Sequence, residues 1–245
     1  MVLGSVDAMC GRFTSRTPAA ARAAWCGGDA VVGPDLGARY NVAPTDETYA
    51  VAEWGGVRRR GTFRWGLVPF WAKDLKIGAK MINARAEGLL DSNAFRRSFE
   101  RRRCIVPADG FYEWEHTGAK RKQPWYVTRP DGRPFAFAGL WDSWRPVKGS
   151  DEGKVRSCVI ITGEPNDKVA RLHDRMPVML EPDQWDIWLD PDNDDVGSLT
   201  QLLVPAPSSQ VELVPVSMLV NTVTNDGPEL IEPVAPEEGT LFSNG

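Results

Sequence analysis

Several features are scarce or absent in this chain of 245 residues. It has only two histidines, and its four cysteines show neither a C-x-x-C pair nor a regular spacing. A metal site rich in histidine is therefore nearly excluded, and we expect no metal. No apolar run approaches the roughly 18 residues that a membrane-spanning helix needs, so we expect no contact with a membrane. No basic segment followed by an apolar stretch indicates a signal peptide.

The missing export signal decides how the cysteines are interpreted. Cys10, Cys26, Cys104 and Cys158 are predicted to be reduced thiols in a cytoplasmic protein, associated with the nucleoid when DNA is bound. No glycine-rich loop suited to phosphates is present, so we expect no nucleotide cofactor, and none of another kind. Hydrophobic residues make up 42% of the chain and charged residues 25%, which are the values of a globular protein.

Charge is distributed unevenly along the chain. The net charge of −4 combines +9 in residues 1–150 with −13 in residues 151–245. Basic clusters occupy 58–60, 96–97, 101–103 and 120–122, all in the first part. Such an imbalance can produce one basic face on an acidic protein, which would suit nucleic acid. The alternative, which charge alone leaves open, is that these side chains are simply solvated.

The apolar pattern predicts short strands punctuated by glycine and proline, with a few helices. We expect helices over 18–25, 92–103, 165–173 and 182–189. We expect strands over 49–54, 62–66, 103–106, 124–128, 134–139, 155–162 and 211–216. Because the two kinds of element do not alternate regularly, the prediction is an α+β fold. It is a single domain rich in antiparallel strands, with a barrel-like sheet core and flanking helices.

Cys10 directly follows Met9, and removal of that methionine would make Cys10 an N-terminal residue. An N-terminal cysteine carries an α-amine and a thiol on adjacent carbons. The amine has an ordinary pKa of about 8 and can condense with an aldehyde to a Schiff base. The thiol can then attack the same carbon intramolecularly and close a thiazolidine ring. A buried structural cysteine near a terminus is the simpler alternative.

An ordered set of motifs accompanies this cysteine. In chain order they span 40–44 (YNVAP), 65–71 (WGLVPFW), 82–87 (INARAE), 103–114 (RCIVPADGFYEW), 138–141 (AGLW), 161–162 (IT) and 172–177 (LHDRMP). Together they closely resemble the SRAP family, the abasic-site processing proteins that sense abasic sites in single-stranded DNA. The resemblance covers Met9 to about Val234.

The resemblance implies capture of the aldehyde of an abasic site by the N-terminal cysteine, as a thiazolidine DNA–protein crosslink that shields the lesion. Cys10 matches that cysteine, Asn83 the asparagine that holds it, Glu113 the active-site glutamate and His173 the active-site histidine. Glutamate and histidine can move the protons that imine formation and ring opening require. Without the resemblance, Glu113 would be read as a strand residue facing water and His173 as a partner of a helix dipole.

The partner implied is single-stranded DNA that contains an abasic site, including junctions with duplex, bound by a monomer. Arg12 and Arg85 can each grip a phosphate with a planar fork. Phe70 and Trp71, in a loop beside Pro69 and Lys73, can stack on bases or wedge at a junction; packing in the core is the alternative for any one tryptophan. The complete set expected to bind DNA is Arg12, Asn41, Pro44, Phe70, Trp71, Arg85, Thr162 and Arg175.

The sequence departs from the family pattern at its start. Residues 1–8 precede Met9, and while they remain attached Cys10 has no free α-amine. We interpret 1–8 as a disordered extension or a mis-assigned start, 9–235 as the abasic-site processing domain and 236–245 as a disordered tail. Two other functions stay open: a thiol peptidase in which Cys10 cleaves its own upstream segment, and a module that binds single-stranded DNA without a covalent bond.

Overall fold

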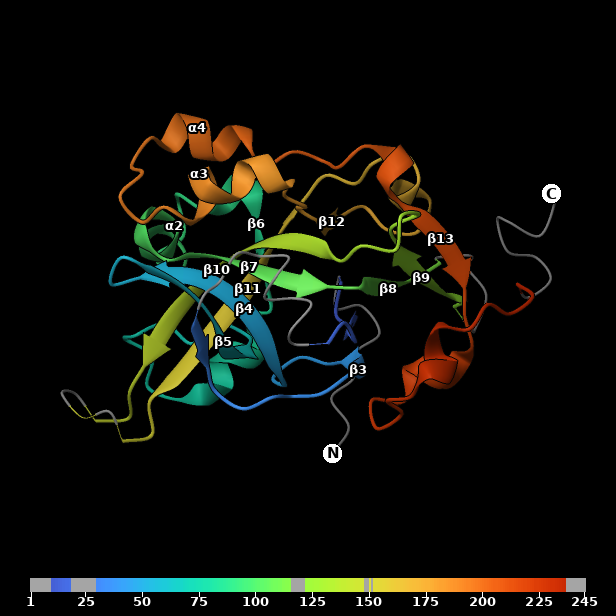
Figure 1. The fold of residues 1–245 in the computed structure, drawn as a ribbon, viewed down its shortest axis with the longest axis horizontal. Coiled ribbons are helices and arrows are strands. Elements are labelled where there is room, and N and C mark those ends of the chain that lie inside the picture. The colour runs from blue at the N-terminus through green and yellow to red at the C-terminus, as the bar shows by residue number, and fades with distance from the viewer. Residues whose placement is uncertain (1–9, 19–29, 116–121, 148–149, 151, 237–245) are drawn as a thin grey trace.

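The fold is described from a computed structural model, which describes residues 10–18, 30–115, 122–147, 150 and 152–236 (Figure 1). The helix expected over 18–25 lies outside the described residues, except for Pro18. The extension 1–8 and, apart from Pro236, the tail 236–245 lie outside them as well. Within the described part of the chain, no helix is long and apolar enough to cross a membrane.

Five strands of the larger sheet close on themselves. The neighbours run β5 (Val57–Trp65), β4 (Glu47–Trp54), β7 (Arg103–Ala108), β10 (Phe135–Trp144) and β11 (Val155–Gly163). Parallel pairing of β11 with β5, at Ser157↔Arg64 and Cys158↔Trp65, completes a barrel. β2 (Ala30–Val32), β6 (Asn83–Arg85) and β12 (Met176–Pro177) extend the sheet outside this ring. The barrel-like core predicted from the sequence is confirmed.

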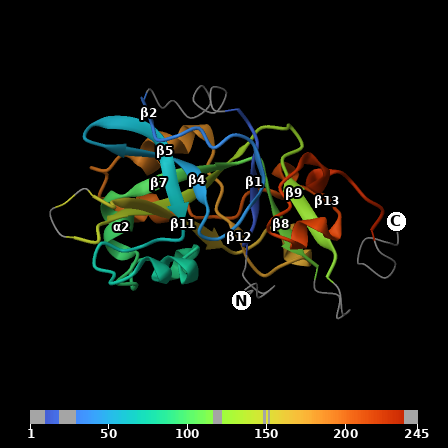
Figure 2. The same cartoon turned by 90° about the horizontal axis from the view of Figure 1, so that it is seen from below.

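A second sheet lies beside the barrel (Figure 2). Its order is β13 (Glu212–Pro215), β9 (Pro124–Thr128), β8 (Gly110–Trp114), β1 (Phe13–Ser15) and β3 (Arg39–Val42), with every neighbouring pair antiparallel. The chain passes from β7 of the barrel to β8 of this sheet through Asp109 alone. Gly110 permits the close approach of Tyr126, whose ring a Cβ would meet at 2.3 Å.

Alternation along the barrel strands separates two apolar clusters. The interior cluster takes Ala50 and Ala52 from β4, Phe63 and Trp65 from β5, and Cys158 and Ile160 from β11. Intervening residues such as Val51, Ile105 and Val159 face outward. There they are covered by α2 (Arg96–Arg101), α3 (Trp185–Leu189) and α4 (Val196–Gln201), which gather on one side of the barrel (Figure 1).

Strand positions were predicted better than helix positions. All seven predicted strands are present, and the prediction missed β1, β2, β3, β6, β8 and β12, most of them too short to show alternation. The helix expected over 92–103 begins only at Arg96, because 92–95 form a turn. It ends at Arg101, and Arg103 is the first residue of β7. The helix expected over 165–173 is wrong except for a 3-10 turn at Val169–Arg171. The helix over 182–189 is confirmed as a 3-10 turn, Pro182–Gln184, that continues into α3.

Candidate active site

Cys10 and Glu113 are brought together by the pairing of β1 with β8. Phe13 lies opposite Phe111, and the Tyr112 amide donates to the carbonyl of Arg12 at 3.0 Å, so the segment before β1 runs along β8. The backbone N–H of Cys10 donates to Oε1 of Glu113 at 2.9 Å. Both residues are buried, at 3% and 2% exposure. Cys10 has φ 44°, a left-handed conformation that is uncommon for a residue with a side chain.

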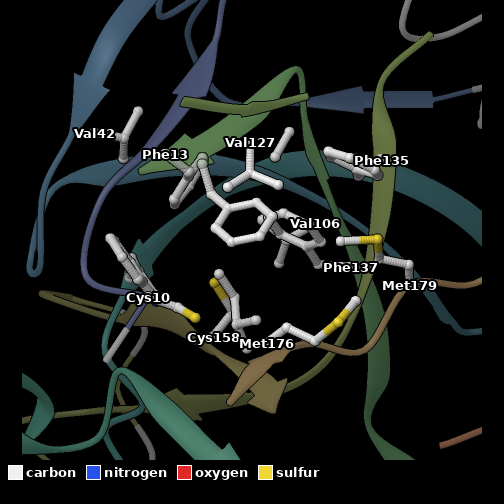
Figure 3. Close-up of a cluster of buried hydrophobic side chains, with 14 of the residues drawn as sticks. Cys10, Phe13, Val42, Val106, Val127, Phe135, Phe137, Cys158, Met176 and Met179 are labelled. Atoms are coloured by element: carbon white, nitrogen blue, oxygen red, sulfur yellow. The ribbon is translucent and has the colours of Figure 1, made fainter. Parts of the chain in front are cut away.

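The Cys10 side chain points into the barrel's interior cluster rather than toward solvent. Figure 3 shows its sulfur in the same cluster as Phe13, Cys158 and Met176. Phe13 packs on Trp65, with ring centroids 4.9 Å apart. Glu113 therefore interacts with both the nitrogen and the thiol of Cys10, whose sulfur otherwise lies among apolar and sulfur-containing side chains.

Burial makes this pair retain protons. The pKa of Glu113 is raised to about 7, mainly by burial and also by the charge of Asp174, against the lowering effect of its bonds from Cys10 and Trp114. The pKa of the Cys10 thiol is raised well above its ordinary value by burial first, and then by the Glu113 carboxylate. At neutral pH the thiol is protonated and Glu113 exchanges a proton readily. A carboxyl group tuned in this way suits general acid–base chemistry.

His173 has partners suited to both of its charge states. Its Nδ1 lies 2.8 Å from Oδ1 of Asp174 and accepts from the amide N–H of Arg175 at 3.2 Å. When the ring is neutral the amide can donate to Nδ1, and when it is charged Nδ1–H can donate to the carboxylate. Arg175, which is buried, in turn makes an ion pair with the exposed Glu87. Leu172 and Met176, on either side of this segment, belong to the same interior cluster as Cys10.

The predicted residues Asn83, Arg85 and Thr162 lie on adjacent strands. Asn83 is opposite Ile160 and Arg85 is opposite Thr162 in the parallel pairing of β6 with β11. Thr162 is fully buried, and its Oγ1 has no hydrogen-bond partner in the described structure, whereas Arg85 is exposed. Ile160 belongs to the interior cluster that contains Cys10, so β6 flanks the same core.

Arg12 and Asn41 are bound to each other. Nη1 of Arg12 donates to Oδ1 of Asn41 at 3.0 Å and to the carbonyl of Val220 at 3.0 Å. Asn41 is fully buried and donates to three carbonyls of the C-terminal segment, those of Val220, Thr222 and Asn225. Burial lowers the pKa of Arg12, which is nevertheless a cation at neutral pH. Pro44 is half-buried in the turn that follows β3.

Phe70 and Trp71 are exposed, at 50% and 49%, in the loop after β5. The guanidinium of Arg97 lies 4.1 Å from the centroid of the Phe70 ring, and the Phe70 amide donates to Oδ2 of Asp142 at 2.8 Å. The loop backbone is thus anchored while both rings reach solvent. This is a suitable geometry for stacking on bases.

The sequence interpretation did not single out Asp174. Its charge raises the pKa of both Cys10 and Glu113, and its carboxylate contacts His173. The signal was present, since Asp174 stands between His173 and Arg175 in the quoted motif. Among the described residues, no group of three His, Cys, Asp or Glu side chains could hold a metal ion.

Comparison with known proteins identifies relatives along most of the chain. The family described as SOS response associated peptidase (SRAP) matches residues 9–223. The chain is 45% identical to "Abasic site processing protein YoqW" of Bacillus subtilis over 193 residues, 79% of this chain and 85% of that protein. It is 31% identical to "Abasic site processing protein YedK" of Escherichia coli, over 92% of this chain and 100% of that one.

The fold also has a solved counterpart. A crystal structure of a protein from Bacteroides thetaiotaomicron superimposes with a TM-score of 0.80 at 25% identity. The superposition covers 92% of this chain and 100% of that one. The barrel and its companion sheet are therefore shared with an experimentally determined structure.

Proposed function

This chain belongs to the SOS response associated peptidase (SRAP) family, and we propose that it captures abasic sites in single-stranded DNA through a covalent bond to Cys10. The relatives carry the name of abasic-site processing proteins, which gives the substrate class. The observation that carries the proposal is the contact between the Cys10 nitrogen and the buried carboxyl group of Glu113.

The first step is imine formation. With Cys10 as the first residue, its amine adds to the aldehyde carbon of the opened sugar, and one water leaves as the C=N bond forms. Glu113, with its pKa raised to about 7, can accept the proton lost by nitrogen and donate one to the departing hydroxyl. Asn83 would orient the amine, and His173 would protonate the sugar oxygen when the ring opens.

The second step is ring closure. The Cys10 sulfur attacks the imine carbon, the thiol proton passes to the Glu113 carboxylate, and the nitrogen recovers a proton. The net change is loss of one water for the whole crosslink. Because the thiol and the amine belong to one residue, this step is intramolecular and fast. The DNA would be held by Arg12, Arg85 and Arg175 on phosphates and by Phe70 and Trp71 on bases, with Asn41, Pro44 and Thr162 lining the path.

The chemistry requires a free amine, whereas in this sequence Cys10 is acylated by Met9. The contact with Glu113 also favours a second activity that would release the Cys10 amine from Met9. Attack of the Cys10 sulfur on the Met9 carbonyl would form a thioester while the C–N bond breaks. Glu113 lies 2.9 Å from that nitrogen and can protonate it as it leaves. Hydrolysis of the thioester then frees the upstream peptide, which is thiol peptidase chemistry.

The test compares two forms of the protein, the 245-residue chain and a chain beginning at Cys10, each checked by intact mass. Both are incubated with a single-stranded oligonucleotide that holds one abasic site. We expect a denaturation-resistant product, one water lighter than the sum of its parts, only when Cys10 is first. Cys10→Ser at the terminus should give an imine that borohydride traps but no stable product. The proposal would be refuted by crosslinking equal to that of the chain beginning at Cys10, either in Cys10→Ala or in a full chain whose upstream peptide is still attached by intact mass.

The same incubation separates the alternatives. Release of the upstream peptide over time, abolished in Cys10→Ala, supports the peptidase step. Retention of undamaged and abasic oligonucleotide alike, sensitive to salt and unchanged in Cys10→Ala, would instead indicate a non-covalent binding module.

A further inference from the structure

One end of the barrel interior is lined by arginine and tryptophan side chains. Alternate residues of a strand face the same side. Trp54 on β4 therefore faces inward with Ala52, and Arg59 on β5 faces inward with Gly61 and Phe63. Arg156 on β11 faces inward with Cys158. Trp141 on β10 and Arg102, just before β7, complete the set. We call these five residues, Trp54, Arg59, Arg102, Trp141 and Arg156, the arginine-ringed mouth.

The mouth is a stack of cations and rings. The guanidinium carbons of Arg59 and Arg156 lie 5.1 and 5.5 Å from the centroid of the Trp54 ring. Trp54 packs on Trp141 with centroids 5.6 Å apart, and Arg102 lies 5.4 Å from the Trp141 ring. Cation–π contacts hold the guanidinium groups in place without neutralising them.

Positive charge is poorly compensated here. Arg102 is paired with Asp142. Among the described residues, Nη1 of Arg59 donates only to the carbonyls of Trp54 and Val57. For Arg156, the ring of Trp54 is the only partner in the part of the chain that the structure describes. Burial lowers the pKa of Arg102, and the charges of Arg97 and Arg145 lower it further, which places two more guanidinium groups nearby.

Two further donors at the mouth lack an acceptor. Trp141 is 8% exposed, and neither its Nε1–H nor the hydroxyl of Ser143 has a hydrogen-bond partner in the described structure. Ser143 is directly opposite Arg156 in the pairing of β10 with β11. Buried donors normally find acceptors, so a site made of unmatched N–H and O–H groups together with guanidinium groups calls for an anionic oxygen ligand.

From this geometry we propose that the arginine-ringed mouth binds a phosphate group. Guanidinium forks match phosphate oxygens in pairs, and the adjacent indoles suit a base attached to that phosphate. The site is distinct from the proposed capture site. Along β5 the interior order is Arg59, Phe63, Trp65, and Phe63 contacts Trp141 while Trp65 contacts Phe13 near Cys10. The mouth therefore lies at the end of this row away from Cys10, and the proposal does not depend on the crosslink.

Titrations with pyrophosphate and with an undamaged single-stranded oligonucleotide test the proposal, using the full chain and the variants Arg156→Gln and Arg59→Gln. Arg133→Gln is the matched control, since Arg133 is an exposed arginine paired with Asp131. We expect either mouth variant to weaken pyrophosphate binding about tenfold, because a charge-assisted contact is lost. Addition of pyrophosphate should also shift the Trp141 indole N–H resonance, identified from a Trp141→Phe spectrum.

The oligonucleotide titration identifies the source of the phosphate. If the ligand is a DNA backbone, Arg156→Gln should lower the slope of log affinity against log salt by about 0.7 for the lost contact. Weaker pyrophosphate binding with an unchanged DNA slope would assign the mouth to a free phosphate compound. Pyrophosphate and DNA binding that equal those of the unaltered chain and the Arg133 control would overturn the proposal. Thermal melting of each variant checks that it is folded.

Discussion

The two ends of the barrel interior differ in how deeply their ionisable groups are buried. Near Phe13, Glu113 and Cys10 are almost completely buried, and burial raises the pKa of both, so the thiol stays protonated and Glu113 titrates near neutral pH. At the arginine-ringed mouth, half-buried guanidinium groups lie against indole rings. A proton-exchanging site thus lies where β1 and β8 of the second sheet meet the barrel, and a cationic site lies on the barrel strands at the other end.

Removing the buried carboxyl group should have the largest effect. In the form that begins at Cys10, we expect Glu113→Gln to slow crosslinking by about 10²- to 10⁴-fold, because general acid–base transfer is lost. Single-turnover rates with the abasic oligonucleotide measure this. Glu47→Gln, on the exposed start of β4, serves as the control and should leave the rate unchanged. A Glu113→Gln rate within twofold of the parent would remove Glu113 from the mechanism.

Phe63→Ala should leave a cavity in the buried side chains that separate the two ends. Phe63 is fully buried and packs edge-on against Trp141 at 5.9 Å. Its truncation should lower the free energy of unfolding by about 3–5 kcal/mol, since a cavity replaces an aromatic ring. Denaturant unfolding gives the value. A loss below that of an exposed-site change such as Glu47→Gln would mean that the two ends are not joined by a packed core.

The pH dependence of stability should reveal the buried carboxyl. The pKa of Glu113 is raised from its ordinary 4.5 to about 7, so folding favours the protonated form. This stabilisation is complete below about pH 4.5 and is lost as the pH rises through about 7, an effect of about 3 kcal/mol. Unfolding free energies measured from pH 4.5 to 8 should fall in the unaltered chain. In Glu113→Gln that fall should disappear; an identical pH profile would show that Glu113 titrates normally.

The smallest effect is expected at the mouth. Arg156→Gln should change the free energy of unfolding by about 0.5–1 kcal/mol, the size of a half-exposed cation–π contact. The contrast with Phe63→Ala, measured by the same denaturant unfolding, sharpens the distinction between a site that stabilises the fold and one that is available to a ligand. A loss as large as that of Phe63→Ala would make Arg156 a structural residue.

Local pattern was sufficient for much of the fold. Short apolar runs punctuated by glycine and proline identified β9 with its observed bounds and located β4, β5, β10 and β11. β1, of three residues, carries too little pattern to be recognised, and β8 was missed although β9, of equal length, was predicted. The pairing of β1 with β8, which positions Cys10 and Glu113, was therefore not predicted, although both residues had been proposed for the site from their motifs.

Nearby residues and ordered motifs were enough to predict the barrel-like sheet core and the family. The tertiary structure decided the rest. Only the fold brings Cys10 to a carboxyl group 103 residues away and removes both from water, which is what raises the pKa of Glu113. Only closure of the barrel gathers arginines from separate strands around two indoles. Burial and long-range proximity depend on the packing of the whole chain, and no local pattern encodes them.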